Sequence, residues 1–229
     1  MIFTYWTSSS LSVPESFPVW QARFPSFRLF GDDDVLHLLP SDELRTLYSQ
    51  ISLPACKSDI ARLILLREYG GLYVDSHAGP ADGDRLAETL DILSSYELVL
   101  FSKAWECKSE TDFNLMNTAL AARAHTALLD KLIAVVLENL AKQRNMEQQT
   151  RKYVPYHLFG LTGTGTIIEC FYDQTKKPFD IKPEYRSKIF QYNMPTLESP
   201  GFKIYQFYGY RKPGGHWSER QQNELLFTE

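Results

Sequence analysis

The chain has 229 residues and a formal net charge of -4, and 44% of its residues are apolar and 23% are charged. This length suits one sizeable α/β core and is rather short for two independent domains, and the composition is that of an ordinary globular protein. The net negative charge argues against a general nucleic-acid binder, which would usually carry a basic surface.

Two short apolar strands and a helix are predicted at the N-terminus. Ile2 to Trp6 and Phe27 to Phe30 have the apolar and aromatic character of strands, and a short helix is expected between them, around Val19 to Arg23. Such a βαβ unit presents its ligand-binding edge just after Trp6 and just after Phe30, at the carboxyl ends of the strands.

Three consecutive acids, Asp32 to Asp34, follow the second strand. Neighbouring carboxylates repel one another unless something binds them, and aspartate is favoured at the N-caps and in the first turns of helices. We therefore interpret the acidic run as the start of a helix over residues 35–39 rather than as a metal site.

Residues 57–80, KSDIARLILLREYGGLYVDSHAGP, begin with a predicted helix. Ser58 or Asp59 is expected to cap it, because a side-chain oxygen there can accept a free N–H group of the first turn. Gly70 and Gly71 are expected to end it, because glycine adopts a left-handed conformation without steric cost. Its apolar stripe consists of Ile60, Leu63, Ile64 and Leu66.

A polar cluster is expected where this unit ends. Leu72 to Val74 form a short strand with Asp75 at its carboxyl end, which is where ligands bind in open α/β sheets. Asp59 and Arg62 are three residues apart and share a helix face, so they join Asp75 if that face points to the strand end. Taken one at a time, each of these features is usually only a helix cap, a turn or a polar strand exit; their order and spacing favour the functional interpretation.

Further elements are predicted along the rest of the chain. We expect helices over Leu86 to Leu93 and over the apolar positions of residues 128–140, and strands at Glu97 to Ser102 and Ile204 to Tyr208. Around residues 158–171 a loop rich in glycine and threonine precedes a helix. This suggests an anion cradle at a helix N-terminus, but the loop lacks the lysine and the glycine spacing of nucleotide-binding loops.

The cysteines and the absence of long apolar runs indicate in which cellular compartment the protein is expected. Cys56, Cys107 and Cys170 are widely spaced and show no metal-binding pattern, so we expect free thiols in a reducing compartment. No apolar run approaches the roughly 20 residues of a membrane-spanning helix, and no signal peptide follows Met1. These features favour a bacterial cytoplasmic enzyme or a secreted effector without a visible signal peptide, and they are compatible with peripheral contact with a membrane.

The run from Ser58 to His77 resembles the central signature of the DXD-containing sugar transferases. This family includes Golgi initiating mannosyltransferases, bacterial capsular polysaccharide transferases and, more distantly, the large glucosylating toxins. The residues in register are Ser58, Asp59, Arg62, Tyr69, Gly70, Gly71, Tyr73 and Asp75.

The resemblance implies a single-domain GT-A type (Rossmann-like) α/β fold over residues 1–229, with a mostly parallel sheet flanked by helices. It also implies a glycosyltransferase that moves a sugar from a UDP- or GDP-sugar to a hydroxyl of a saccharide, a protein or another acceptor, with retention of the anomeric configuration. In such enzymes orientation and charge stabilisation supply most of the rate. Residues 209–229 are expected to form a mobile lid that excludes water from the donor, or else a frayed terminus.

The residues expected to act on the donor follow from the same resemblance. Asp59, Arg62 and Asp75 are the expected catalytic residues: the first two hold the sugar hydroxyls, and Asp75 holds the ribose or a metal. Trp6 matches a tryptophan that stacks on the nucleotide base, although a core aromatic residue would suit this position equally well. The full donor-binding set is Tyr5, Trp6, Ser58, Asp59, Arg62, Tyr73, Asp75, Ser76, Asn117 and Trp217.

Two further matches lie outside the central signature. Asn117 corresponds to an asparagine that opens a helical run of small residues in the family. Thr162 and Gly163 correspond to a loop on the acceptor side of the cleft, where Thr164 replaces the proline of the family.

The chain departs from the family at His77, where the second acid of the DXD motif is expected. In the family the acid pair holds a divalent cation, usually manganese, on the donor diphosphate. The resemblance therefore implies an Mn²⁺ site made by Asp75, His77 and His216, although imidazole suits zinc, iron, nickel and copper better. Arg211 and Lys212 of the same tail suit phosphate oxygens.

Three consequences of the histidine stay open at this point. They are a changed metal preference, a weaker or absent metal requirement, and a catalytically silent nucleotide-sugar binding protein, or pseudoenzyme. A structural domain with no ligand is a weaker further alternative.

Overall fold

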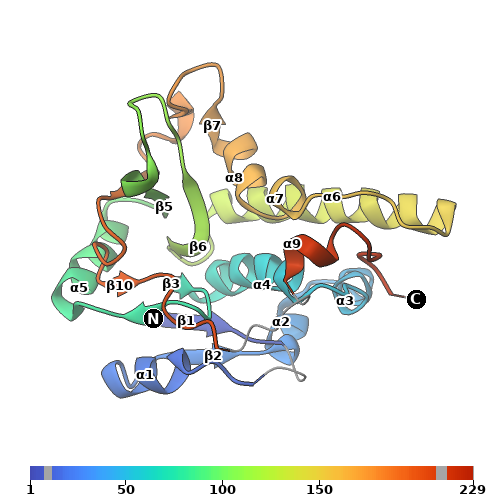
Figure 1. The fold of residues 1–229 in the computed structure, drawn as a ribbon, viewed down its shortest axis with the longest axis horizontal. Helices are drawn as coiled ribbons and strands as arrows, with labels where there is room; N and C mark the ends of the chain where they lie inside the picture. Colours follow the sequence, from blue (N-terminus) through green and yellow to red (C-terminus); the bar gives the residue numbers. More distant parts are fainter. Residues whose placement is uncertain (8–11, 210–215, 229) are drawn as a thin grey trace.

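The computed structural model describes residues 1–7, 12–209 and 216–228. Within these ranges a six-stranded sheet of order β2-β1-β3-β6-β5-β9 forms the centre of the molecule (Figure 1). β6 runs antiparallel to both of its neighbours, and the other pairings are parallel. In sheet order, the strands are β2 (Arg28–Phe30), β1 (Ile2–Tyr5), β3 (Gly71–Val74), β6 (Leu115–Ala122), β5 (Leu98–Lys103) and β9 (Ile189–Met194).

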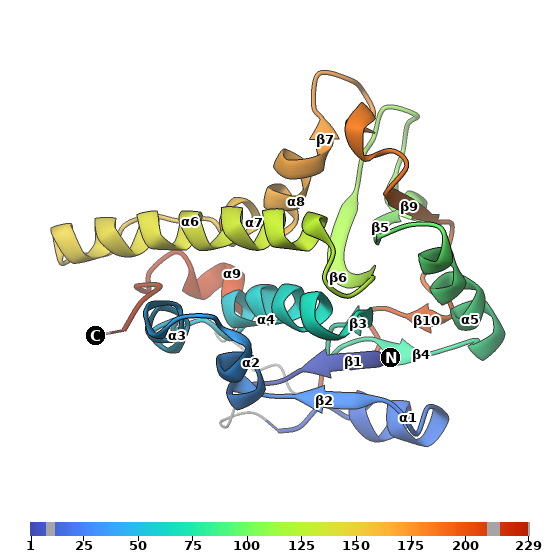
Figure 2. The same cartoon turned by 180° about the vertical axis from the view of Figure 1, so that it is seen from behind.

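Helices cover both faces of the sheet, which confirms the expected α/β class with a mostly parallel sheet flanked by helices. On one face an apolar cluster joins the strands to α1 (Ser16–Arg23) and α5 (Gly83–Asp91) through Trp20 and Leu86. On the other face α4 (Pro54–Tyr69) lies between the sheet and the long helix α6 (Ala127–Thr150), as Figures 1 and 2 show from opposite sides.

The remaining elements are short. The helices are α2 (Asp32–Leu38), α3 (Asp42–Ser49), α7 (Leu158–Leu161), α8 (Thr164–Phe171) and α9 (Trp217–Arg220), with 3-10 turns at Ile92–Ser94, Ala104–Glu106 and Pro183–Tyr185. Two small antiparallel pairs are formed by β4 (Gly79–Pro80) with β10 (Phe202–Lys203) and by β7 (Tyr172–Asp173) with β8 (Asp180–Ile181). The acidic run at Asp32 opens α2, as expected.

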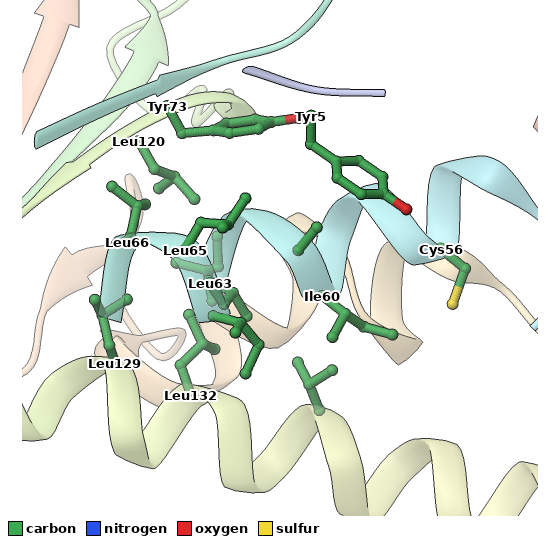
Figure 3. Packing of buried hydrophobic residues seen from close by; sticks show 14 of the residues in the cluster. Tyr5, Cys56, Ile60, Leu63, Leu65, Leu66, Tyr73, Leu120, Leu129 and Leu132 are labelled. Carbon is green, nitrogen blue, oxygen red and sulfur yellow. The ribbon is translucent and has the colours of Figure 1, made fainter. Parts of the chain in front are cut away.

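Helix α4 is buried along most of its length, because the sheet covers one side of it and α6 covers the other. Figure 3 shows Leu63, Leu65 and Leu66 packed between Tyr73 of the sheet and Leu129 and Leu132 of α6. A helix in this position must be apolar nearly all round rather than along one stripe.

The start of α4 differs from the prediction. The helix begins at Pro54, with Leu53 at the N-cap, so neither Ser58 nor Asp59 caps it. Proline is favoured at the first helical position because its missing N–H would be unpaired there in any case. Ser58 and Asp59 therefore lie inside the helix, where their side chains are free to take part in a polar cluster.

The Gly-Gly pair ends α4, as predicted, and also lets the N-terminal strand approach. Gly70 and Gly71 have φ values of 62° and 99°, which side-chain-bearing residues rarely adopt. A Cβ on Gly71 would collide with the backbone of Met1, whose carbonyl accepts a hydrogen bond from the Leu72 N–H at 2.9 Å. Glycine is therefore required for β3 to pair beside β1.

Replacing Gly71 by alanine is expected to lower the free energy of unfolding by about 2 kcal/mol or more, because a positive φ is strained for alanine and the new methyl group meets the Met1 backbone. Gly160→Ala is the matched control, since a Cβ at Gly160 would meet no atom within 4 Å. Chemical denaturation of both variants tests this, and equal midpoints would contradict it.

Two predicted elements were wrong. The run of small residues that starts at Asn117 lies in strand β6 and is not a helix. This strand is covered on both faces, so its residues are apolar without alternation, and periodicity cannot distinguish such a strand from a buried helix. The expected strand from Ile204 to Tyr208 is also absent: β10 ends at Lys203, and Tyr205 has a φ of 60°.

The chain from Gln221 to Phe227 is anchored in the core. The buried carboxylate of Glu147 on α6 accepts hydrogen bonds from the N–H groups of Leu226 and Phe227, both at 3.1 Å. Arg211 and Lys212, near the start of the predicted lid, lie outside the described residues. In the part of the chain that the structure describes, no helix has both the length and the apolar character needed to cross a membrane.

Candidate active site

Asp59, Arg62 and Asp75 lie together at the carboxyl end of β3. Nη2 of Arg62 is 3.1 Å from Oδ1 of Asp59 and 3.1 Å from Oδ1 of Asp75. The Asp75 N–H donates to the carbonyl of Thr118 on the neighbouring strand at 2.7 Å, which fixes the backbone at the strand end. One guanidinium group therefore bridges two carboxylates, one from α4 and one from the sheet.

An irregularity between β5 and β6 helps to position Arg62. The register passes from Leu100 opposite Leu120 to Phe101 opposite Met116, so β6 bends beside the site. The carbonyl of Asn117 in this stretch accepts a hydrogen bond from Nη1 of Arg62. Strand β6, part of which was expected to be a helix, thus provides a backbone hydrogen-bond acceptor for the guanidinium group of Arg62.

Arg62 is almost fully buried. It is 4% exposed, and its guanidinium carbon lies 4.9 Å from the centre of the Tyr73 ring. Burial alone would lower the pKa of Arg62, but the negative charges of Asp75 and Asp59 outweigh it and raise that pKa. Arg62 is therefore a permanent cation that holds the two acids in place.

Asp59 is the most internal acid of the cluster. It is 7% exposed; its Oδ2 accepts a hydrogen bond from the Thr162 hydroxyl at 2.8 Å, and its Oδ1 accepts one from the Asn117 side chain at 2.9 Å. Burial raises the pKa of Asp59, and Arg62, Thr162 and Asn117 counteract this only in part. A continuous series of polar contacts thus runs from Thr162 through Asp59 and Arg62 to Asp75.

Asp75 is the more exposed end of this series. Its Oδ1 also accepts a hydrogen bond from the Tyr73 hydroxyl at 2.7 Å, and that hydroxyl lies 2.8 Å from Oγ of Ser58. Burial and the neighbouring charge of Asp75 raise the pKa of Tyr73, so its hydroxyl stays protonated and can donate. The other oxygen, Oδ2, lies 3.9 Å from Nδ1 of His77, and the Asp75 side chain is 20% exposed.

Of the residues expected to bind a metal, Asp75 and His77 lie near each other, with 3.9 Å between Oδ2 of Asp75 and Nδ1 of His77. The ring of His77 lies nearly parallel to the rings of Tyr205 and Tyr208, at 5.5 Å and 5.2 Å between centres. His216 caps α9, where its Nδ1 accepts from the Ser218 N–H at 3.3 Å. Among residues 1–7, 12–209 and 216–228, no three His, Cys, Asp or Glu side chains form a group that could hold a metal.

A second polar cluster, around Asp32, was not predicted. The Asp32 carboxylate accepts hydrogen bonds from the hydroxyls of Tyr5, Thr7 and Tyr48, the last at 2.8 Å, and from Nζ of Lys57 at 3.2 Å. Burial alone would raise the pKa of Asp32, but these hydrogen bonds and the lysine charge lower it. Tyr5, which was expected to meet the donor, is 3% exposed, and its hydroxyl joins β1 to α2 and α3 here.

Tyr48→Phe is expected to lower the free energy of unfolding by about 2 kcal/mol, because the variant removes a buried hydrogen bond to a carboxylate. Burial raises the pKa of Tyr48 in the folded protein. The unfolded chain therefore loses its tyrosine proton first, and the wild type loses stability above about pH 10, the ordinary pKa of tyrosine. Denaturation at pH 7 and pH 10.5 tests this; an identical pH slope in the variant would contradict it.

The other predicted residues lie as follows. Trp6 follows β1, half-buried, with its ring 6.1 Å from that of Phe17. The carbonyl of Ser76 accepts a hydrogen bond from the Ser16 hydroxyl at 2.6 Å. Gly163 precedes α8, directly after Thr162, and Trp217 opens α9 and packs against the main core.

Residues 12–82 match the family model described as "Glycosyltransferase sugar-binding region containing DXD motif". This region holds Asp59, Arg62, Asp75 and His77 and amounts to less than a third of the chain, so Asn117 and Thr162 lie outside it. No curated protein matches the chain.

Solved structures resemble the fold at low sequence identity. The UDP-bound glycosyltransferase domain from the YGT toxin is 14% identical, with a TM-score of 0.43 over 82% of this chain and 57% of that chain. Its ligand-free form is 13% identical, with a TM-score of 0.39 over 68% and 52%. A structure described as PaToxG Glycosyltransferase is 12% identical, with a TM-score of 0.45 over 74% and 67%.

Proposed function

We propose that this chain is a glycosyltransferase of the GT-A type that transfers a sugar from a UDP- or GDP-sugar to a hydroxyl group of a saccharide or protein, with retention. The observation that carries the proposal is the bridge from Asp59 through Arg62 to Asp75 at the carboxyl end of β3, inside the region that matches the DXD family model. Strand ends of this kind are where α/β sheets bind nucleotides.

In the proposed reaction, the bond between the anomeric carbon and the diphosphate oxygen breaks, and a bond from that carbon to the acceptor oxygen forms. The acceptor proton passes to the leaving diphosphate. Oδ2 of Asp75 accepts a hydrogen bond from a hydroxyl of the donor, while Arg62 and Tyr73 donate to Oδ1 and so fix the carboxylate in one orientation. Positioning of this kind, rather than a separate base, supplies most of the rate.

The test is incubation with a panel of UDP- and GDP-sugars, with manganese, zinc or a chelator, followed by detection of free or transferred sugar. Release of sugar from one donor is the expected result. Donor binding without any product under every condition would favour the pseudoenzyme, an alternative motivated by the stacking of His77 on two tyrosines. Absence of donor binding would overturn both.

A further inference from the structure

A diphosphate leaving group needs positive charge beside it, and the described residues do not supply a metal cluster for that purpose. This inference rests on the proposed function and concerns which group of the protein meets the diphosphate. The side chain at the second DXD position is a histidine packed against Tyr205. A cation close to the Tyr205 ring is therefore a candidate for this role.

Lys103 is such a cation. It is the last residue of β5, which runs in the same direction as β3, so Lys103 lies at the same edge of the sheet as Asp75. Its Nζ lies 5.7 Å from the centre of the Tyr205 ring, and the centre of the same ring lies 5.5 Å from that of the His77 ring. Tyr205 thus connects the lysine to the histidine that follows Asp75.

Tyr205 is held in a strained conformation. Its φ of 60° lies in the left-handed region, and its side chain is 40% exposed. The next two residues, Gln206 and Phe207, donate their N–H groups to the carbonyl of His77, at 2.9 Å and 3.2 Å. Non-glycine residues keep such a conformation only when their surroundings enforce it, and these residues cluster at functional sites.

Lys103 is paired with an acid that a phosphate could replace. Its Nζ is 2.6 Å from Oε2 of Glu106, which also accepts a hydrogen bond from the side chain of Asn114 at 2.6 Å. The Glu106 side chain is 37% exposed. A diphosphate carries more negative charge than this single carboxylate and can compete with it for the ammonium group.

We propose that the ammonium group of Lys103 contacts the diphosphate of the nucleotide-sugar donor, with Tyr205 as the positioning residue that holds it beside His77. Lys103 then supplies the positive charge that a metal bound by the second acid supplies in the DXD family. Glu106 holds the lysine in place when the donor is absent.

The test compares UDP with uridine, and GDP with guanosine, as ligands of the full chain in EDTA. Lys103→Met is expected to weaken binding of UDP or GDP by about tenfold, because one hydrogen bond to a charged group is lost. Binding of uridine or guanosine is expected to stay unchanged. Glu106→Gln is expected to act in the opposite direction and tighten UDP or GDP binding several-fold.

Lys131→Met is the matched control, because Lys131 makes the same kind of pair with Tyr185, at 2.6 Å to the hydroxyl and 5.1 Å to the ring centre, outside the site. Equal diphosphate affinities of the wild type and Lys103→Met would overturn the proposal, as would an equal loss in the control. If either result is found while the wild type still binds the nucleoside, the role of Lys103 is wrong but the proposed function is not contradicted. If the wild type binds no nucleoside or nucleotide, both proposals fail.

Discussion

Asp75→Asn is expected to lower kcat/KM for sugar release or transfer by about a hundredfold, because the donor loses a hydrogen bond to a charged, fixed carboxylate oxygen. The fold should change little. The asparagine oxygen can still accept from the Tyr73 hydroxyl and from Arg62, which keeps its ion pair with Asp59. Steady-state rates with the donor selected from the panel, together with thermal unfolding, test this expectation.

Asp33→Asn is the control for this substitution. Asp33 is an exposed acid of α2, so its replacement removes the same charge outside the polar cluster. Activity of Asp75→Asn within twofold of that of Asp33→Asn would remove Asp75 from the mechanism. A large loss of thermal stability in Asp75→Asn would show that the residue supports the fold instead.

Arg62→Met is expected to lower the free energy of unfolding by about 3 to 5 kcal/mol at pH 8, because it leaves two carboxylates without their shared cation. The side chain of Asp59 is only 10% exposed, so its charge has little access to water. Addition of Asp59→Asn should restore part of the loss, since it removes the stranded charge. Urea denaturation of the wild type, both single variants and the double variant measures this coupling.

The pH dependence of Arg62→Met follows from the same burial. Burial already raises the pKa of Asp59 in the wild type, and removal of Arg62 takes away an opposing influence. A raised pKa in the folded state gives stability that is full below the unfolded value, about 4, and is lost as the pH rises. The defect of Arg62→Met should therefore be smaller at pH 5 than at pH 8. A defect that does not vary with pH would mean that removal of Arg62 does not raise the pKa of Asp59 in the folded protein.

The core of the site could be predicted because its signals are local. Asp59 and Arg62 share a helix face, and Asp75 follows the next strand along the chain, so helix periodicity and the strand-end rule were enough to bring the three together. Asp32 also follows the carboxyl end of a strand. Its interpretation as a helix start was correct, but it did not predict the hydrogen bonds that Asp32 accepts from Tyr5 and Tyr48.

The remaining contacts depend on packing between distant segments. Thr162 is 103 positions from Asp59 in the sequence. No local pattern distinguishes a hydroxyl that reaches a buried acid from one that faces solvent. Tyr205 likewise acquires its φ of 60° from the surrounding chain, because nothing in its own chemistry favours a left-handed conformation.

The hydroxyl of Thr162 has a consequence for any attempt to redesign this protein. It belongs to the segment between α7 and α8, beyond residues 12–82, yet it holds the acid that orients Arg62 and through it Asp75. A loop exchange that aims to change acceptor preference would also alter donor affinity unless a threonine or serine is kept at position 162. Under the proposed function we therefore expect changes in this loop to affect both acceptor choice and donor affinity, and variants with an exchanged loop should be assayed for both.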